Sequence, residues 1–151
     1  MTGSTSADQA DNSGPLEKRL VSKNWSVRAN AYDELTKMCM DAQVDSKAAF
    51  FGEYAGEFKT YLKDSNPGAL EKALTTLEAF LQKAKGQVVV EHQNGIIDML
   101  VEKCLSHAKP VIKNKGTECL LLLFECTESF DDCVDTLNNL ANNKNVKVSD
   151  L

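Results

Sequence analysis

The stretch "WSVRANAYDEL", residues 25–35, decides the fold because its pattern of apolar and small residues occurs twice more along the chain, and the three stretches align without gaps. The copies are "PGALEKALTTL" at residues 67–77 and "PVIKNKGTECL" at residues 110–120, so successive starts lie 42 and 43 residues apart. Each copy has an apolar third position, a small seventh position, leucine at the eleventh and an apolar residue three further on. These residues are Val27, Ala31, Leu35 and Met38; Ala69, Ala73, Leu77 and Phe80; Ile112, Gly116, Leu120 and Leu123. Such spacing marks one face of an α-helix, and the small residue lets a neighbouring helix approach closely.

A second helical segment precedes each of these striped helices. The segments are residues 16–20, "FFGEYAGEFKTYL" (50–62) and "IIDMLVEKCL" (96–105), and "FDDCVDTLNNL" (130–140) begins a fourth pair. The repeating unit is therefore helix, tight turn, helix, and its length near 42 residues is typical of HEAT and armadillo units. The sequence predicts an all-α chain, an α-solenoid of HEAT-type helical hairpins with about three and a half units.

The predicted units have boundaries that follow the repeat. They are residues 15–42, 48–85, 94–128 and 129–151, the last incomplete, after a disordered lead-in at residues 1–14. Because the chain ends in the first turns of a fourth striped helix, we expect it to be part of something longer. The stretch "QVVVEHQNG" (87–95) has strand-like β-branched residues and an Asn-Gly turn signal. With no second strand to pair with, it is predicted to connect two units.

Composition argues against several classes of protein. No run of 18 apolar residues is present, and residues 1–14 lack the basic and apolar regions of a secretory signal. The chain has five cysteines and two histidines, and Cys119, Cys126 and Cys133 follow one another at a helical spacing of seven. This spacing disfavours a metal site and indicates buried free thiols in a reducing compartment such as the cytosol.

The sequence also lacks the usual signs of an enzyme. It has no GxGxxG, P-loop, GxSxG or HExxH motif. Cys104 and His107 could form a dyad on one helix, but Cys104 belongs to an apolar stripe and is expected in the core. A net charge of -5 and the absence of an RNA-stacking motif argue against nucleic-acid binding. We therefore expect a binding protein with no catalytic residue, cofactor or metal.

The turns inside successive hairpins of a solenoid line up along one edge, and this edge is basic. Seven of the 17 lysines and arginines lie in the turns or the helix starts that follow them. They are Arg28, Lys72, Lys109, Lys113, Lys115, Lys144 and Lys147. A basic edge on an acidic chain suggests an acidic partner that binds along this edge. Basic residues near a helix N-terminus are also slightly unfavourable because they oppose the helix dipole, which favours a functional reason for them. The alternative is that lysine is simply a common surface residue at helix starts.

The only tryptophan, Trp25, lies in the first of these turns. Asn66 is predicted to cap the second striped helix with Pro67 at its first position, and Trp25 and Pro110 take the corresponding places. Trp25 could pack over its own helix as a hydrophobic staple. It could instead be an exposed anchor, since tryptophan and arginine are enriched in interface hot spots and Arg28 lies beside it on the helix. The residues leave both interpretations open.

The stretch "PLEKRLVSKNWSVRANAYDEL" (15–35) resembles the opening of a TOG domain from the ch-TOG and mini spindles family of microtubule polymerases. The second and third units are similar to "YLKDSNPGALEKALTTLEAFL" (61–81) and "VEKCLSHAKPVIKNKGTECLLLLFE" (101–125). "LNNLANNKNVKV" (137–148) resembles the start of the fourth. TOG domains of this family are flat paddles of six HEAT units, so the fifth and sixth units are absent from this chain.

The resemblance implies that the turn edge binds the free αβ-tubulin heterodimer, on its β-tubulin side for these units, and so serves microtubule growth. It implies a cytoplasmic location on microtubules, the spindle and the centrosome or spindle pole. It implies no role for nucleic acid, membrane or a small-molecule substrate. Carried over residue by residue, the expected tubulin-binding residues are Trp25, Val27, Arg28, Asn66, Pro67, Lys109, Lys113, Lys115, Lys144 and Lys147. The alternative is a generic HEAT-repeat scaffold that binds another acidic protein or peptide.

Overall fold

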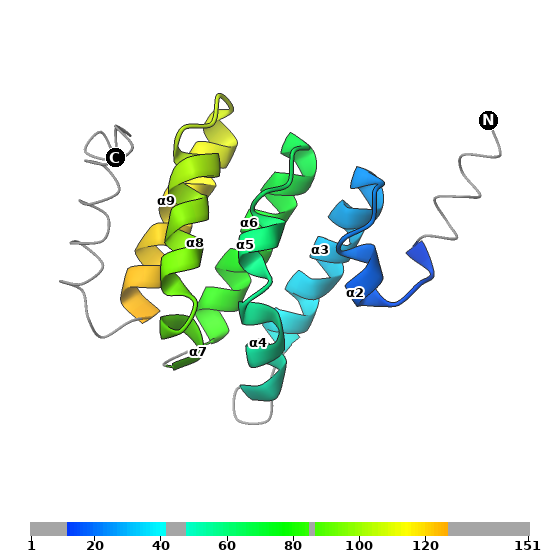
Figure 1. Ribbon diagram of the computed structural model, residues 1–151, viewed down its shortest axis with the longest axis horizontal. Coiled ribbons are helices and arrows are strands. Elements are labelled where there is room, and N and C mark those ends of the chain that lie inside the picture. The colour runs from blue at the N-terminus through cyan, green and yellow to red at the C-terminus, as the bar shows by residue number, and fades with distance from the viewer. Residues whose placement is uncertain (1–11, 42–47, 85–86, 127–151) are drawn as a thin grey trace.

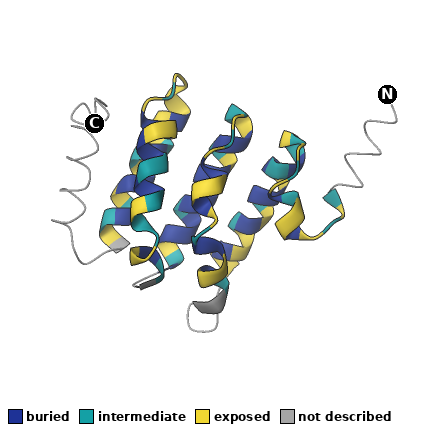
Figure 2. Cartoon of the chain, viewed as in Figure 1, coloured by how far each residue is buried: buried dark blue, intermediate teal, exposed yellow. Residues whose placement is uncertain are grey.

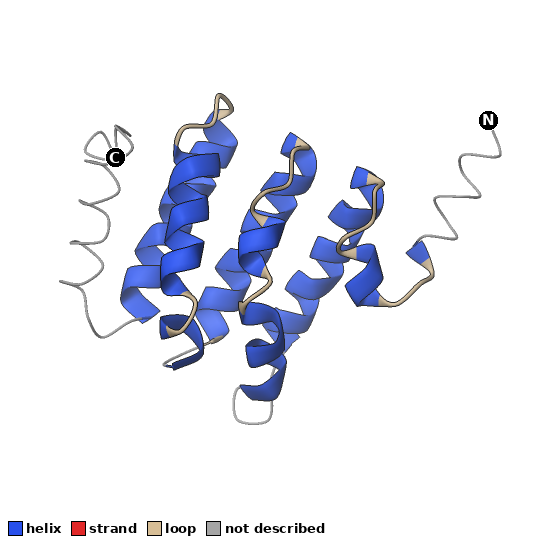
Figure 3. Cartoon of the chain, viewed as in Figure 1, coloured by secondary structure: helices blue, strands red, loops and turns tan. Residues whose placement is uncertain are grey.

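The computed structural model describes residues 12–41, 48–84 and 87–126, and within them all regular structure is helical (Figure 3). The elements are α2 (Leu16–Arg19), α3 (Trp25–Asp41), α4 (Ala48–Ala55), α5 (Phe58–Tyr61), α6 (Pro67–Lys83), α7 (Gln87–Val90), α8 (Gln93–Met99), the π-helix η2 (Leu100–Leu105) and α9 (Pro110–Cys126). The prediction of an all-α chain of helical hairpins is confirmed. The predicted fourth unit and most of the lead-in lie outside the described residues.

The helices form two layers in a single row of hairpins (Figure 1). The long helices α3, α6 and α9 make one layer, in which α3 packs on α6 and α6 packs on α9. The shorter helices make the other layer, where α4 contacts α7 and α5 contacts α8. Because α6 has a long helix on each side, its buried residues cover more of its circumference than those of α3 (Figure 2).

The predicted stripe is buried in α6 and α9, and in α3 all but its last residue is buried. That residue, Met38, is 36% exposed, whereas its counterparts Phe80 and Leu123 are fully buried. The expectation for Met38 is therefore wrong, and the reason is its position in the row. The helix that precedes α3 in its hairpin, α2, has only four residues, whereas α6 is preceded by α4 and α5, and α9 by α8 and η2 (Figure 1).

The stacking contacts repeat in atomic detail between successive hairpins. The buried Thr76 hydroxyl on α6 donates to the Tyr32 carbonyl on α3 at 2.9 Å. At the corresponding positions one unit later, the Cys119 thiol on α9 contacts the Leu74 carbonyl on α6 at 3.5 Å. The repeat read from the sequence is thus a repeat of interfaces as well as of helices.

The short-helix layer departs from the prediction in two places. Residues 50–62 were expected to form one helix, but α4 ends at Ala55 and α5 begins at Phe58. The break falls at Gly56, where an added Cβ would lie 3.2 Å from the His92 ring, so the neighbouring hairpin approaches the backbone closely. The second difference is the stretch at residues 87–95, which forms the one-turn helix α7 and the start of α8.

Gly116 allows a close helix approach between α9 and the π-helix η2. A Cβ added at Gly116 would lie only 2.8 Å from the Cβ of Cys104, which is fully buried. The small residue predicted at this position therefore lets two helices meet. The contact also shows that Cys104 belongs to the core, as the sequence predicts.

Replacing Gly116 with alanine is expected to destabilise the fold because the new methyl group overpacks the α9–η2 contact. We expect Gly116→Ala to lower the free energy of unfolding by about 1–3 kcal/mol, measured by urea unfolding followed by circular dichroism. The matched control is Gly52→Ala in α4, where an added Cβ meets nothing within 4 Å. The control should be neutral or stabilising by up to about 1 kcal/mol, because alanine favours helix. Equal effects of the two substitutions would contradict the packing argument.

Candidate functional site

The turns within the three described hairpins lie side by side along one edge, at the top of Figure 1. Each turn is fixed by a side chain that accepts a hydrogen bond from the backbone N–H two residues later. The acceptors are Ser22 for Asn24 (3.1 Å), Asp64 for Asn66 (3.0 Å) and His107 for Lys109 (3.0 Å). Hydroxyl, carboxylate and imidazole groups therefore build the same local turn at equivalent positions of the repeat.

The first two turns end in asparagine caps. The Asn66 side chain accepts a hydrogen bond from the Ala69 N–H at 3.0 Å, and Pro67 occupies the first turn of α6, which confirms the predicted cap. Asn24 does the same for α3, accepting from the backbone N–H and the hydroxyl of Ser26 at 3.0 and 2.8 Å. These bonds fix the direction in which each long helix leaves the edge.

Trp25 is the first residue of α3 and is 49% exposed. Its ring leans toward the second turn, where a Cβ added at Gly68 would lie 3.7 Å from the ring atom Cζ3. A hydrophobic staple would bury the ring against its own helix, whereas this indole spans two hairpins and keeps half of its surface in solvent. Such a half-exposed aromatic ring on a rigid turn suits contact with a partner.

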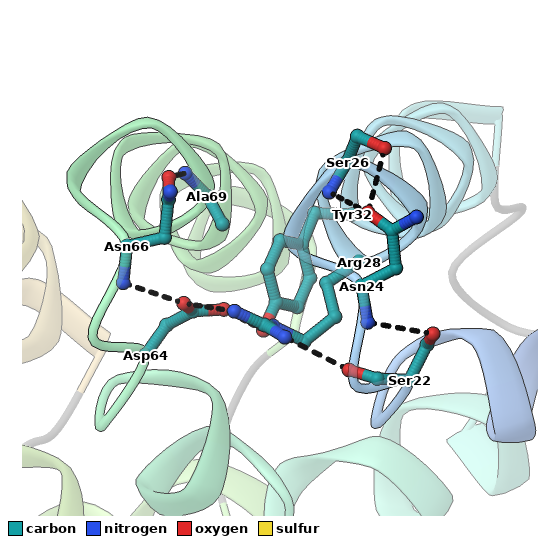
Figure 4. A network of polar contacts seen from close by, with 8 residues as sticks. All are labelled: Ser22, Asn24, Ser26, Arg28, Tyr32, Asp64, Asn66 and Ala69. Carbon is teal, nitrogen blue, oxygen red and sulfur yellow. Dashed lines mark hydrogen bonds and ion pairs between the residues drawn. The ribbon is translucent and has the colours of Figure 1, made fainter. Parts of the chain in front are cut away.

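Arg28 makes its bonds inside the molecule (Figure 4). Its Nε donates to Asp64 Oδ2 at 2.7 Å and its Nη2 to Asp64 Oδ1 at 2.8 Å, while Nη1 donates to the Ser22 carbonyl at 2.8 Å. The Asp64 side chain is 1% exposed and that of Arg28 is 17% exposed. Arg28 Nε and Nη2 therefore join the first turn to the second, and Nη1 bonds within the first turn, so contact of Arg28 with a partner stays a prediction.

The Asp64 carboxylate is the centre of this network. It also accepts a hydrogen bond from the buried Tyr32 hydroxyl at 2.9 Å. Burial alone would raise the pKa of Asp64, but the hydrogen bonds from Arg28, the Asn66 N–H and Tyr32 outweigh it, so this pKa lies below the ordinary value. The hydrogen bond to Asp64 raises the pKa of Arg28, and burial raises that of Tyr32. The pair is therefore charged, and the phenol neutral, at physiological pH.

The other residues predicted to bind a partner differ in their exposure: some are exposed, one is hydrogen-bonded to a neighbouring helix, and one is buried. Lys109 and Lys113 are exposed in the third turn and on the first turn of α9. Lys115 is half-buried and donates to the Thr75 hydroxyl on α6 at 3.0 Å. Val27 is fully buried, so its assignment to the binding surface is wrong: it is the first core residue of the α3 stripe. Lys144 and Lys147 lie outside the described residues.

Sequence reasoning missed several residues of this edge. Lys23 and Lys63 are exposed in the first and second turns, and Val111 is 41% exposed at the start of α9. Asp64 and Gly68, which build the second turn around Trp25, were not singled out either. Extending the repeat alignment three residues toward the N-terminus would have found Asp64, because it occupies the same position as Ser22 and His107.

The described residues hold no metal-ligand cluster and no helix long and apolar enough to cross a membrane. Burial raises the pKa of the Cys104 thiol to about 12, so the thiol is neutral at physiological pH. His107 accepts the hydrogen bond that shapes the third turn. These two residues therefore have separate structural roles.

A family model described as XMAP215/Dis1/CLASP, TOG domain, matches residues 11–150. The chain belongs to this family. Among its TOG relatives, Centrosomal protein 224 of Dictyostelium discoideum is 33% identical over 130 residues, covering 86% of this chain. Protein mini spindles of Drosophila melanogaster is 29% identical over 136 residues, covering 89% of this chain. The chain spans only 6% of the length of each of these relatives.

The fold also matches that of a solved structure of TOG domains. The match has a TM-score of 0.74 at 28% identity and covers 83% of this chain and 26% of the other. That structure concerns tubulin recruitment and assembly by microtubule polymerases with tumor overexpressed gene (TOG) domain arrays. Membership of the TOG family confirms the resemblance seen in the sequence and the HEAT-type solenoid that it implied.

Removing the charge of Asp64 is expected to destabilise this TOG fold in a pH-dependent way. Asp64→Asn leaves Arg28 without its ionic partner, so we expect the free energy of unfolding to fall by about 3 kcal/mol at pH 7. Because the folded pKa of Asp64 lies below the unfolded value of about 3.9, its contribution is present above that value and is lost as pH falls through the folded pKa. The difference between parent and variant, from urea unfolding at several pH values, should therefore shrink below about pH 4.

The matched control is Asp33→Asn. Asp33 pairs with Lys72 at 3.2 Å, but both side chains are nearly half exposed, so the loss should be under about 1 kcal/mol. A difference for Asp64→Asn that stays constant from pH 7 to pH 3 would show that the carboxylate charge is not its source.

Proposed function

We propose that this chain is a tubulin-binding module of a microtubule-associated protein, and that it holds the free αβ-tubulin heterodimer through its turn edge. The observation that carries the proposal is the half-exposed Trp25 on an edge that is held rigid by a buried ion pair. Membership of the TOG family and the similar solved structure, which concerns tubulin recruitment, support tubulin as the partner. The module binds its partner and catalyses no bond chemistry.

The finer assignment is that these hairpins contact the β-tubulin side. Trp25 supplies the apolar contact, and the exposed lysines of the turns, Lys23, Lys63, Lys109 and Lys113, face acidic tubulin surface. In the whole protein the module promotes microtubule growth by raising the local concentration of tubulin at the microtubule end. The names of relatives, which include a centrosomal protein and a spindle pole body component, support a place in the cytoskeleton.

Trp25→Ala is expected to weaken tubulin binding strongly. A hot-spot tryptophan contributes about 2 kcal/mol or more, so the Kd should rise by about 30-fold. The measurement is fluorescence anisotropy of the chain, labelled at its N-terminal amine, titrated with unpolymerised αβ-tubulin. The control is Met40→Ala near the other end of α3, because Met40 is also 49% exposed. Binding that survives Trp25→Ala would make the indole a packing residue, and no binding by the parent chain would refute the proposed function.

Charge reversal in the third turn should weaken binding mainly through electrostatics. For the double variant Lys109→Glu and Lys113→Glu we expect a Kd at least about tenfold higher at low salt, with the difference from the parent narrowing at about 0.3 M NaCl. Lys37→Glu, an exposed lysine far along α3 from the turns, is the control and should change little. Equal losses for Lys37→Glu and the double variant would indicate non-specific attraction to tubulin rather than a basic edge.

A further inference from the structure

The Trp25 indole lies where two hairpins meet, and the groups that join these hairpins belong to its own helix and to the facing turn. We propose that Arg28, Asp64 and Gly68 are positioning residues that hold the indole in its binding orientation before the partner arrives. This inference rests on the proposed function, because it assigns these residues a role in partner recognition through Trp25.

The first step is the tie between the helix that carries Trp25 and the turn beside it. Arg28 lies one helical turn after Trp25 and is fixed to the Ser22 carbonyl on one side and to both Asp64 oxygens on the other. A lysine could make only a point contact here, whereas the planar guanidinium fixes direction as well as distance. The start of α3 therefore has a set position relative to the second turn.

The second step is that the same carboxylate shapes the surface under the indole. Asp64 Oδ1 accepts hydrogen bonds from Arg28 and from the Asn66 N–H, and Asn66 in turn caps the helix turn that contains Gly68. One helical turn after Trp25, hydrogen bonds thus lead from Arg28 to Asp64 and on to Asn66, and the Trp25 ring lies 3.7 Å from the position of a Cβ added at Gly68. A shift of Arg28, Asp64 or Asn66 would therefore change the position of the surface against which the Trp25 ring lies.

The junction between the second and third hairpins lacks these residues and so can be compared with the first. The third hairpin has Val111 at the position of Gly68, and the second hairpin has Leu70 at the position of Arg28. The third turn uses His107 where the second uses Asp64. Of the two junctions between described hairpins, the arginine, the aspartate and the glycine therefore occur together at the one that carries the tryptophan, and the other is built from different residues.

Pre-ordering the indole has a direct consequence for affinity. A tryptophan that is free to change rotamer must be ordered on binding, and ordering one such side chain weakens binding by roughly threefold to tenfold. The positioning residues remove that loss without touching the partner themselves.

The test uses the two variants Gly68→Val and Arg28→Lys of the 151-residue chain. Valine places a branched side chain against the ring. Lysine keeps the positive charge but lacks the planar guanidinium that bonds both Asp64 oxygens. Because Trp25 is the only tryptophan, its fluorescence reports its environment directly. We expect acrylamide quenching to rise, by up to about twofold since the side chain is already 49% exposed, and tubulin affinity to fall by about threefold to tenfold. Gly52→Val, at an open position of α4, is the matched control for valine in a helix and should change neither quenching nor affinity.

A double-mutant cycle separates positioning from general stability. In a Trp25→Ala background, Gly68→Val should weaken tubulin binding no further, because there is no indole left to position. An equal loss in both backgrounds, or unchanged quenching in both variants with folding intact by circular dichroism, would overturn the proposal. If the parent chain does not bind tubulin, the proposed function fails, and the quenching measurement alone decides whether these residues position Trp25.

Discussion

The buried carboxylate of Asp64 is the constraint on which the candidate site depends. It accepts four hydrogen bonds, from Arg28 Nε and Nη2, the Tyr32 hydroxyl and the Asn66 N–H. A buried charge is tolerated only when its lone pairs are satisfied in this way, so the four donors must be present together. They come from α3 and from the second turn, and a single side chain therefore fixes the position of one hairpin against the next.

Much of the fold could be predicted from the sequence because a solenoid uses the same pattern in every unit. The stripe of Ala69, Ala73, Leu77 and Phe80 is the core face of α6, and Asn66 caps that helix as its sequence context indicates. The errors occur where one copy differs from its neighbours. Met38 has the right spacing but belongs to the first hairpin, and the helix expected over residues 50–62 breaks at Gly56, where His92 of the next hairpin lies close by. Spacing along one helix contains no information about what stacks beside it.

The candidate site was predicted less completely for a related reason. Arginine and lysine are both expected at a surface that binds an acidic partner. Only a structure shows that Arg28 is bound inside the molecule while Lys109 is exposed. Val27 was included by its place in a family turn, although its side chain points into the core. Asp64 was overlooked because a carboxylate is a poor candidate on a basic edge, and its contribution is to build the edge rather than to contact a partner.

The two junctions of this row differ in mechanical terms. Between the first and second hairpins, a buried ion pair and an aromatic ring oppose any change of angle. Between the second and third, the Cys119 thiol meets a carbonyl and the Lys115 ammonium meets a hydroxyl, which are softer restraints. At the turn edge, the polar contacts of the first junction are therefore more numerous and include a buried ion pair. A change of angle at the first junction would take donors away from a buried carboxylate, which is costly.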